Sequence, residues 1–483
     1  MKKEELFEAL NDIDDKYIKE ARKSNPNKKK TILRWTSLVA CAAILISAVF
    51  VTPLLTKKPA GEQPKYPKGV VAMASVYPGP VGVGMTAEEF LESDESYDWW
   101  VDFRGRVKKA QGLSGSMEDY NLELMSNVLV SDSENTVCSP LNTYIAFSML
   151  AEITDGNSRR QILDMLGCDD IKELRENNKL LWESNYADTP VIKSILANSL
   201  WMNEDIKYKN DTIKTLTDNY YASAFSGRPG SNEFNEALRR WTDYNTADLL
   251  KDYTENMEIK KDTVMELVST IYYKASWAAK FEKVATEKET FHGVDGDTTV
   301  DMMHNFDLTS YYLTDNFEAF SLSLTDSGSM YFYLPKEGVD VNALASDKDV
   351  LEILDHESER YSECSRPAYI NMSVPKFDIS AQTDLVETLV KMGVTDVFDL
   401  AAADFSPLTE EDRDIFVSKV DHAAVVSIDE DGVTGAAYTD IAMTEGAVYL
   451  DMTIDFVLDR PFMFIVRAED GSVLFSGIVR NIE

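Results

Sequence analysis

The side chains that could carry chemistry in this sequence do not combine into an enzyme's active site. Only four residues could act as imidazole bases, namely His292, His304, His356 and His422, and a structural role explains each of them better. The nucleophile motif G-x-S-x-G does not occur, since the nearest match reads GLSGS. Neither a phosphate-binding loop nor a dinucleotide fingerprint is present. The sequence therefore predicts a protein that is not an enzyme and has no catalytic residues.

An acidic run, DEDG at 429–432, resembles part of a calcium-binding loop. The EF-hand spacing would place Ser427 at the first ligand position and Tyr438 at the last, where carboxylates are required. The four cysteines, at positions 41, 138, 168 and 364, form no CxxC pair and are too sparse for a disulfide framework. We therefore predict no metal site and no cofactor, and we assign no disulfide bridge, which leaves the disulfide state of Cys138, Cys168 and Cys364 open.

The stretch that contains this acidic run, Ser427 to Pro461, has a pattern unusual for a loop. From Val433 onward, one set of alternate side chains is small or apolar and uncharged, whereas the other set carries an aspartate and several hydroxyls. This period of two is typical of a strand with one buried face. The first third is nevertheless rich in Gly and Ala, which have weak strand propensity, and Gly432 provides a permissive hinge. The segment could remain an exposed loop or become a strand, and an ordinary solvent loop is the alternative.

This pattern resembles the reactive-centre loop of the serpins, which inhibit serine proteases by inserting a loop into their own sheet. Family hinges commonly carry alanine where this chain has Gly435 and Tyr438. The resemblance assigns the hinge to Glu430, Asp431, Gly432, Val433, Thr434, Gly435, Ala436, Ala437, Tyr438 and Thr439.

The resemblance extends over residues 116–483. Matching positions in family order include Asn135, Ser139, Pro140, Asn198, Trp201, Trp277, Phe291, Pro375, Phe377, Gly393, Phe405, His422, Pro461, Phe462 and Gly477. It implies a mixed α/β (α+β) serpin fold, with a large, mostly antiparallel central sheet, surrounding helices and an exposed reactive-centre loop.

The resemblance also implies a polar network at the place where the sheet must open. Family members usually carry an asparagine that bonds a histidine like His422, and this chain has Ser269 at that position. We expect the network to be rebuilt from Ser139, Asn142, Ser269 and His422, because a buried polar group needs a partner. Trp277 completes the predicted sheet-opening region.

Local patterns predict the individual elements of the body. Residues 144–166 read as two helices separated by a turn at 154–157. Segments rich in Val, Ile, Tyr and Phe predict strands at 264–273, 329–334, 369–379, 415–428, 462–467 and 473–479.

The N-terminal region differs from the body in charge and composition. Residues 1–36 hold 10 Lys and Arg against 7 Asp and Glu, whereas the remaining chain holds 38 against 76, which argues against nucleic acid as a partner. Residues 38–55 carry no charge over 18 positions. We therefore predict a cytoplasmic segment at 1–30, a transmembrane signal-anchor at 31–55, an extracytoplasmic linker at 56–115 and the serpin domain at 116–483. Within the linker, the aromatic cluster Trp99, Trp100 and Phe103 is the exception and could dock on the domain or on something beyond it.

This organisation predicts a single-pass protein of a bacterial cell membrane, with its domain outside the cytoplasm. A cleaved signal peptide is the rival interpretation, but the small residues at 72–74 lie too far from the apolar run to serve as its cleavage site. We expect the domain to be a monomer.

The resemblance implies suicide inhibition of a serine protease. The protease would cleave the loop, and Val433–Met443 would insert as a central strand before the acyl-enzyme is hydrolysed. Family spacing places the reactive bond between Gly446 and Ala447, and counting from the far end extends the bracket to Met443–Leu450. No Arg or Lys occurs from Val433 to Leu458, which favours an elastase-like target. The alternative is a non-inhibitory serpin that acts as a cell-surface binding or scaffold protein.

Overall fold

The computed structural model describes residues 64–73, 78–325, 327–411, 414–433 and 452–482. The predicted cytoplasmic segment at 1–30 and the predicted membrane anchor at 31–55 lie outside these residues. Among the residues that are described, no helix is both long enough and apolar enough to cross a bilayer.

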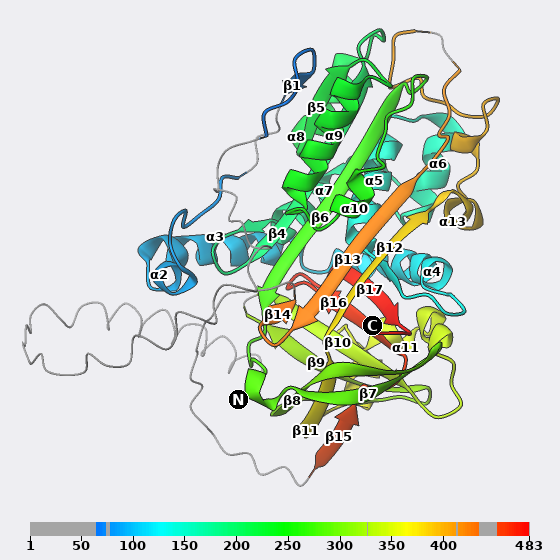
Figure 1. Ribbon diagram of the computed structural model, residues 1–483. Coiled ribbons are helices and arrows are strands. Elements are labelled where there is room, and N and C mark those ends of the chain that lie inside the picture. Colours follow the sequence, from blue (N-terminus) through cyan, green and yellow to red (C-terminus); the bar gives the residue numbers. More distant parts are fainter. Residues whose placement is uncertain (1–63, 74–77, 326, 412–413, 434–451, 483) are drawn as a thin grey trace, which may run out of the picture. The chain divides into compact units, whose positions relative to one another are not determined.

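Two sheets organise the described chain (Figure 1). The first, sheet A, has the order β1-β5-β4-β6-β14-β13-β12, with β3 paired to β4. The second, sheet B, has the order β15-β11-β8-β9-β10-β16-β17-β2, with β7 paired to β8. The pairings are antiparallel except for β4 with β5 and β11 with β15. The predicted large, mostly antiparallel sheet is confirmed.

The strands of sheet A are β1 (Val71–Met73), β3 (Ala187–Asp188), β4 (Lys193–Asn203), β5 (Ala222–Gly227), β6 (Met265–Ser276), β12 (Phe377–Asp384), β13 (Asp421–Asp429) and β14 (Gly432–Val433). Those of sheet B are β2 (Thr136–Cys138), β7 (Glu287–Gly293), β8 (Gly296–Leu313), β9 (Phe317–Leu324), β10 (Gly328–Pro335), β11 (Ser365–Pro375), β15 (Thr453–Val457), β16 (Phe462–Arg467) and β17 (Val473–Val479).

The helices surround these sheets, and the longer ones precede β6 in the chain. They are α2 (Ala87–Leu91), α3 (Asp94–Ala110), α4 (Glu118–Val128), α5 (Pro140–Glu152), α6 (Gly156–Met165), α7 (Ile171–Asn185), α8 (Asn210–Asn219), α9 (Asn232–Asn245), α10 (Lys251–Thr254), α11 (Asp349–Glu352), α12 (Glu359–Cys364) and α13 (Val386–Lys391). Short 3-10 helices are η1 (Ser114–Met117), η2 (Lys283–Ala285), η3 (Val341–Ser346) and η4 (Asp396–Phe398).

Helix α5 lies at the centre of the core and contacts both β6 and β17. Its side chains are buried around nearly the whole circumference and most of them are apolar, as expected for a helix that crosses the core. Pro140 occupies its first turn, where the missing N–H costs nothing. The predicted helix pair at 144–166 is confirmed as α5 and α6, and the predicted turn lies at their junction.

Most predicted strands are confirmed, with two differences. The segment predicted as one strand at 369–379 is divided between β11 in sheet B and β12 in sheet A, because the chain leaves one sheet at Pro375 and Lys376. The strand predicted at 415–428 begins only at Asp421.

The region predicted to be a linker contains folded structure that packs on the domain. Phe90, Trp99 and Phe103 of α2 and α3 are buried against Val191 and its neighbours, immediately before β4. Trp99 and Phe103 stack with their ring centroids 4.8 Å apart. Strand β1 extends sheet A by pairing with β5. Average composition predicted a tether here, whereas the few aromatic side chains bury enough apolar surface to hold residues 78–110 in place.

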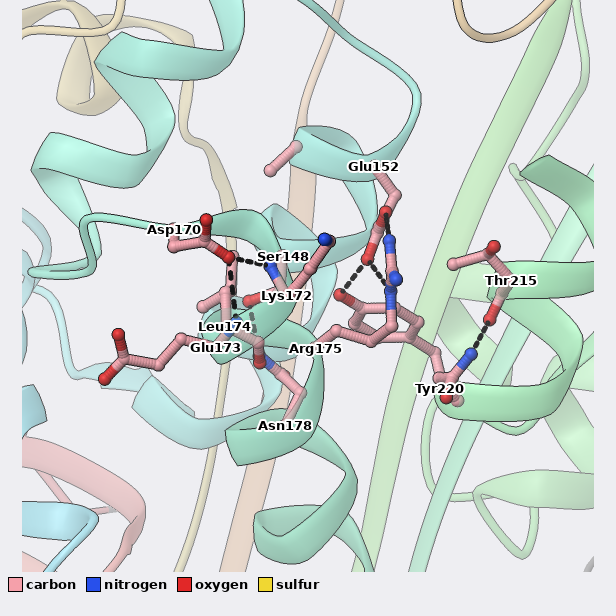
Figure 2. Close-up of polar contacts among 12 residues, drawn as sticks. Ser148, Glu152, Asp170, Lys172, Glu173, Leu174, Arg175, Asn178, Thr215 and Tyr220 are labelled. Atoms are coloured by element: carbon pink, nitrogen blue, oxygen red, sulfur yellow. Dashed lines mark hydrogen bonds and ion pairs between the residues drawn. The ribbon is translucent and has the colours of Figure 1, made fainter. Parts of the chain in front are cut away.

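Buried polar contacts join the helices behind sheet A (Figure 2). Arg175 on α7 donates two hydrogen bonds of 2.7 Å to the carboxylate of Glu152 on α5, whose side chain is 4% exposed. The Tyr220 hydroxyl donates to the same carboxylate at 2.9 Å. Asn178 donates to Ser148 at 2.8 Å. These contacts fix α7 and the start of β5 relative to the central helix.

Candidate functional site

The short strand β14 lies between β6 and β13 at one end of sheet A (Figure 1). Gly432 pairs with Ser276 of β6 and with Asp429 of β13, and Val433 pairs with Ala275 and Ile428. Within the described residues, β6 and β13 share no backbone pairing of their own, and β14 is the strand that hydrogen-bonds to both. The sheet therefore already holds the beginning of an additional central strand.

The two residues of β14 fit this position closely. A Cβ atom on Gly432 would lie 2.2 Å from the carbonyl oxygen of Ala275, so only glycine allows the backbone to approach β6 this far. Val433 is 2% exposed and packs beside Ala275 and Ile428, which are also buried. The predicted hinge thus begins as an inserted strand with an apolar inward side chain.

The turn before β14 is held by two hydrogen bonds from Trp277, which is 1% exposed. Its indole Nε1 donates to the carbonyl of Asp429 at 2.8 Å, and its backbone N–H donates to the carbonyl of Asp431 at 3.2 Å. The Asp429 carboxylate accepts hydrogen bonds from the N–H groups of Asp431 and Gly432 at 2.8 and 3.2 Å. Trp277 therefore fixes the point at which the loop leaves β13.

The two acidic hinge residues are paired with lysines. Glu430 accepts from Lys376 at 2.9 Å and from the Thr286 hydroxyl at 2.9 Å. Burial alone would raise the pKa of Glu430, but these hydrogen bonds together hold it below its usual value. Asp431 lies 3.0 Å from Lys283 and 3.4 Å from Lys280. Burial likewise acts to raise the pKa of Asp431, and the two lysines hold it below its usual value.

The other predicted sheet-opening residues, Ser139, Asn142, Ser269 and His422, form two hydrogen-bonded clusters. On the β13 side, the backbone N–H of Ser139 donates to Nε2 of His422 at 3.0 Å. Burial lowers the pKa of His422 from 6.5 to about 4, and its role as an acceptor agrees with a neutral ring.

On the β6 side, the Ser269 hydroxyl lies 2.5 Å from Oδ1 of Asn142 and 2.7 Å from Oδ1 of Asn198. Nδ2 of Asn142 donates to the Ser269 carbonyl at 3.2 Å. Sequence reasoning grouped Asn142 and Ser269 with His422 in one network. Within the described residues the polar contacts form two clusters, one on β13 and one on β6, which meet the same helix, α5, at Ser139 and Asn142.

Sequence reasoning missed several residues of this site. Asn198 was noted as a position that matches the family, but no role was assigned to it. It lies opposite Ser269 in the neighbouring strand, and this strand pairing is what connects the two residues. Lys376 and Lys283 come from distant parts of the chain, and no local pattern connects them to the hinge. The remaining predicted positions, 434–439 of the hinge and the reactive-bond bracket at 443–450, lie outside the described residues.

The cysteines of the described part, Cys138, Cys168 and Cys364, are free thiols. Burial raises the pKa of Cys138 to about 12, so this thiol stays protonated.

Comparisons with known proteins converge on one family. The model of the family described as "Serpin (serine protease inhibitor)" matches residues 116–482. Alpha-1-antiproteinase 2 of Equus caballus is 30% identical over 386 residues, covering 76% of this chain and 86% of that protein. A serine protease inhibitor of Cyanea capillata is 25% identical over 374 residues, covering 74% of this chain and 96% of that protein.

Among solved structures, the native state of the thermophilic serpin tengpin has the same fold. It superposes with a TM-score of 0.66 at 24% identity and covers 76% of this chain and 93% of that chain. The match of the family model to three quarters of the sequence, together with the shared fold, decides the assignment. This chain belongs to the serpin family, whose members are protease inhibitors rather than enzymes.

Proposed function

We propose that this serpin traps a serine protease by inserting its cleaved loop, Val433–Met443, between β6 and β13. The position of β14 carries the proposal, because the hinge already pairs with both strands at the point where insertion would start. Further insertion would add ladder hydrogen bonds to both neighbours and bury the inward side chains. The acyl bond to the protease serine would then be carried away from the position in which water can attack it.

The register of β14 supports this mechanism. Val433 faces inward beside Ala275, so alternation would turn Gly435, Ala437, Thr439, Ile441 and Met443 inward as well. Continuing the pairing by six residues would bring Thr439 level with Ser269 of β6 and His422 of β13. The hydroxyl-bearing residue of the inward set would thus come level with one member of each polar cluster.

The same register gives a reason for the unusual glycine in the hinge. Gly435 would lie level with Tyr273, whose side chain is 4% exposed and whose hydroxyl is hydrogen-bonded to Ser327 at 2.7 Å. A residue without a side chain leaves room beside this large buried ring. Tyr438 would fall on the outward set, where a bulky side chain costs less.

The target that fits the loop best is an elastase-like protease. The absence of Arg and Lys from Val433 to Leu458 removes the anchors that trypsin-like enzymes require. We place the reactive bond at Gly446–Ala447, within the bracket Met443–Leu450. We further propose that residues 31–55 anchor the protein in the cell membrane as a single pass, and that the monomeric domain acts outside the cytoplasm of a bacterium.

An adduct assay tests the proposed function. Residues 64–483, which retain the docked N-terminal helices, are mixed with an elastase-class serine protease and separated in SDS. We expect an SDS-resistant adduct, and mass spectrometry of the released C-terminal peptide should locate the bond within 443–450. Complete cleavage without an adduct, also with chymotrypsin-class and subtilisin-class enzymes, would instead indicate a non-inhibitory binding protein.

A further inference from the structure

Acidic side chains gather at the ends of β6 and β13 that lie away from β14 (Figure 1). Asp421, the first residue of β13, pairs directly with Asp384 at the end of β12. Glu266, the second residue of β6, is close enough to Asp421 for the two negative charges to repel each other. We call Glu266, Asp384 and Asp421 the distal carboxylate row.

The three side chains of the row turn to the same face of sheet A. Ser269 of β6 and His422 of β13 both point toward α5. Because side chains alternate along a strand, Glu266 and Asp421 turn to the opposite face, and Asp384 follows its partner Asp421. An acidic side chain that entered between β6 and β13 on this face would therefore join a row of like charges.

One lysine balances the row in part. Lys419 forms an ion pair with Asp421 at 2.6 Å. Burial, followed by the negative charge of Asp421, raises the pKa of Glu266 to about 7, and Lys419 offsets only part of this rise. Glu266 thus gains a proton close to neutral pH, because the row already holds more negative charge than its single lysine compensates.

The other elements beside Glu266 bring no free cation to it among the described residues. On β4, the residue opposite Glu266 is Trp201, which is uncharged. Helix α9 packs against β6, but Arg239 donates to a backbone carbonyl at 3.1 Å and Arg240 pairs with a carboxylate at 2.8 Å. The acidic residues of the same helix are Glu233, Glu236 and Asp243.

The proposed insertion would add a fourth carboxylate. Continuing the register of β14 by seven residues brings Asp440 level with Val268 of β6 and Asp421 of β13. Asp440 belongs to the outward set of the loop, so its side chain would turn to the face that carries the row. It would lie directly opposite Asp421 and diagonal to Glu266, at Cβ separations of about 5 Å and about 8 Å.

We propose that the distal carboxylate row makes the last part of loop insertion dependent on pH, with acid favouring complete insertion. The proposal rests on the proposed function, since only an inserted loop brings Asp440 to the row. Like charges directly opposite each other destabilise a sheet, so insertion raises the proton affinity of Asp440 and its neighbours. A form that binds more protons is favoured as the pH falls. Asp440 enters late, so the repulsion acts when trapping competes with hydrolysis.

The variant Asp440→Asn tests this proposal because it removes the added charge. Asp451→Asn makes the same change in the same loop beyond the reactive-bond bracket, where the chain does not enter the sheet, and is the matched control. Parent and variants are mixed with elastase-, chymotrypsin- and subtilisin-class proteases at about pH 8 and about pH 5.5, on either side of the pKa of Glu266. The molar ratio of cleaved chain to SDS-resistant adduct is measured, together with the urea midpoint of each purified cleaved chain.

Comparison at one pH with one protease cancels the pH dependence of the protease itself. At about pH 8, we expect the ratio of cleaved chain to adduct to be about threefold higher for the parent than for Asp440→Asn. The cleaved parent should also unfold at a lower urea concentration than cleaved Asp440→Asn. Both differences should disappear at about pH 5.5 and shrink in about 1 M NaCl, while Asp451→Asn behaves as the parent.

Equal values for the parent and Asp440→Asn at both pH values would overturn the pH dependence and leave trapping intact. If no protease forms an adduct, the proposed function fails, and the urea midpoints of the cleaved chains still decide whether the row opposes insertion. A cleaved chain that is no more stable than the intact protein at either pH would overturn both proposals.

Discussion

Replacing Val433 by arginine places a charge at the first inward position of the loop. Val433 is 2% exposed between Ala275 and Ile428, so the guanidinium would have no partner when β14 is inserted. The neighbouring carboxylates of Glu430 and Asp431 already bind lysines, and that of Asp429 accepts from two backbone N–H groups. Burying an unpaired charge costs at least about 3 kcal/mol. The variant would therefore leave β14 outside the sheet before cleavage, and insertion would then have to bury the charge. A barrier raised by about 3 kcal/mol slows that step roughly 150-fold, because each 1.36 kcal/mol changes a rate tenfold.

Such a delay lets water hydrolyse the acyl-enzyme first, so Val433→Arg should be cleaved as a substrate. The assay is the adduct fraction in SDS together with titration of the protease activity that remains. Val433→Thr, which has a similar shape and no charge, is the control and should still form the adduct. If Val433→Arg inhibits with the stoichiometry of the parent protein, the insertion mechanism is wrong.

Three further predictions follow from buried groups. The pKa of His422 is lowered to about 4, so as the pH falls from 6.5 the unfolded chain binds a proton that the folded chain excludes. The free energy of unfolding should therefore fall by up to about 3 kcal/mol between these values, and His422→Gln should remove this dependence in urea titrations. Arg175→Ala leaves the carboxylate of Glu152 buried without its cation, so it should lower the free energy of unfolding by about 3 kcal/mol in urea titrations. Arg160→Ala breaks an exposed ion pair and should change this free energy by less than about 1 kcal/mol. Equal effects of the two substitutions would contradict the role of burial. Phe103→Ala should undock α3, so hydrogen exchange should speed up in this helix and not in β6, and unchanged exchange would show that the aromatic cluster does not hold it.

Much of the fold could be predicted because local patterns and burial agree. The apolar run of α5 has only one stable location, which is the core, and the strands rich in Val, Ile and Phe at 462–467 and 473–479 are buried in sheet B. The break between β11 and β12 could not be predicted, since both halves have the same strand pattern and only their partners differ. Helix α3 itself was not predicted, because average composition suggests a tether and only its aromatic residues indicated that this segment could dock.

The candidate site could be predicted in part. The family resemblance drew attention to Gly432 and Val433, and the structure adds the reason for them in the close approach to β6 and the buried pairing. The lysine partners of the acidic hinge residues could not be read from the sequence, because Lys376 lies 54 positions from Glu430. The separation of His422 from Ser269 likewise depends on the distance between two strands, which no local pattern encodes.

A crystal structure of the protein after cleavage within 443–450 tests the central claim most directly. The account predicts that residues 434–443 continue β14 between β6 and β13, with Thr439 level with Ser269 and His422. A cleaved protein in which β6 and β13 pair directly with each other, and the loop remains outside the sheet, would contradict it.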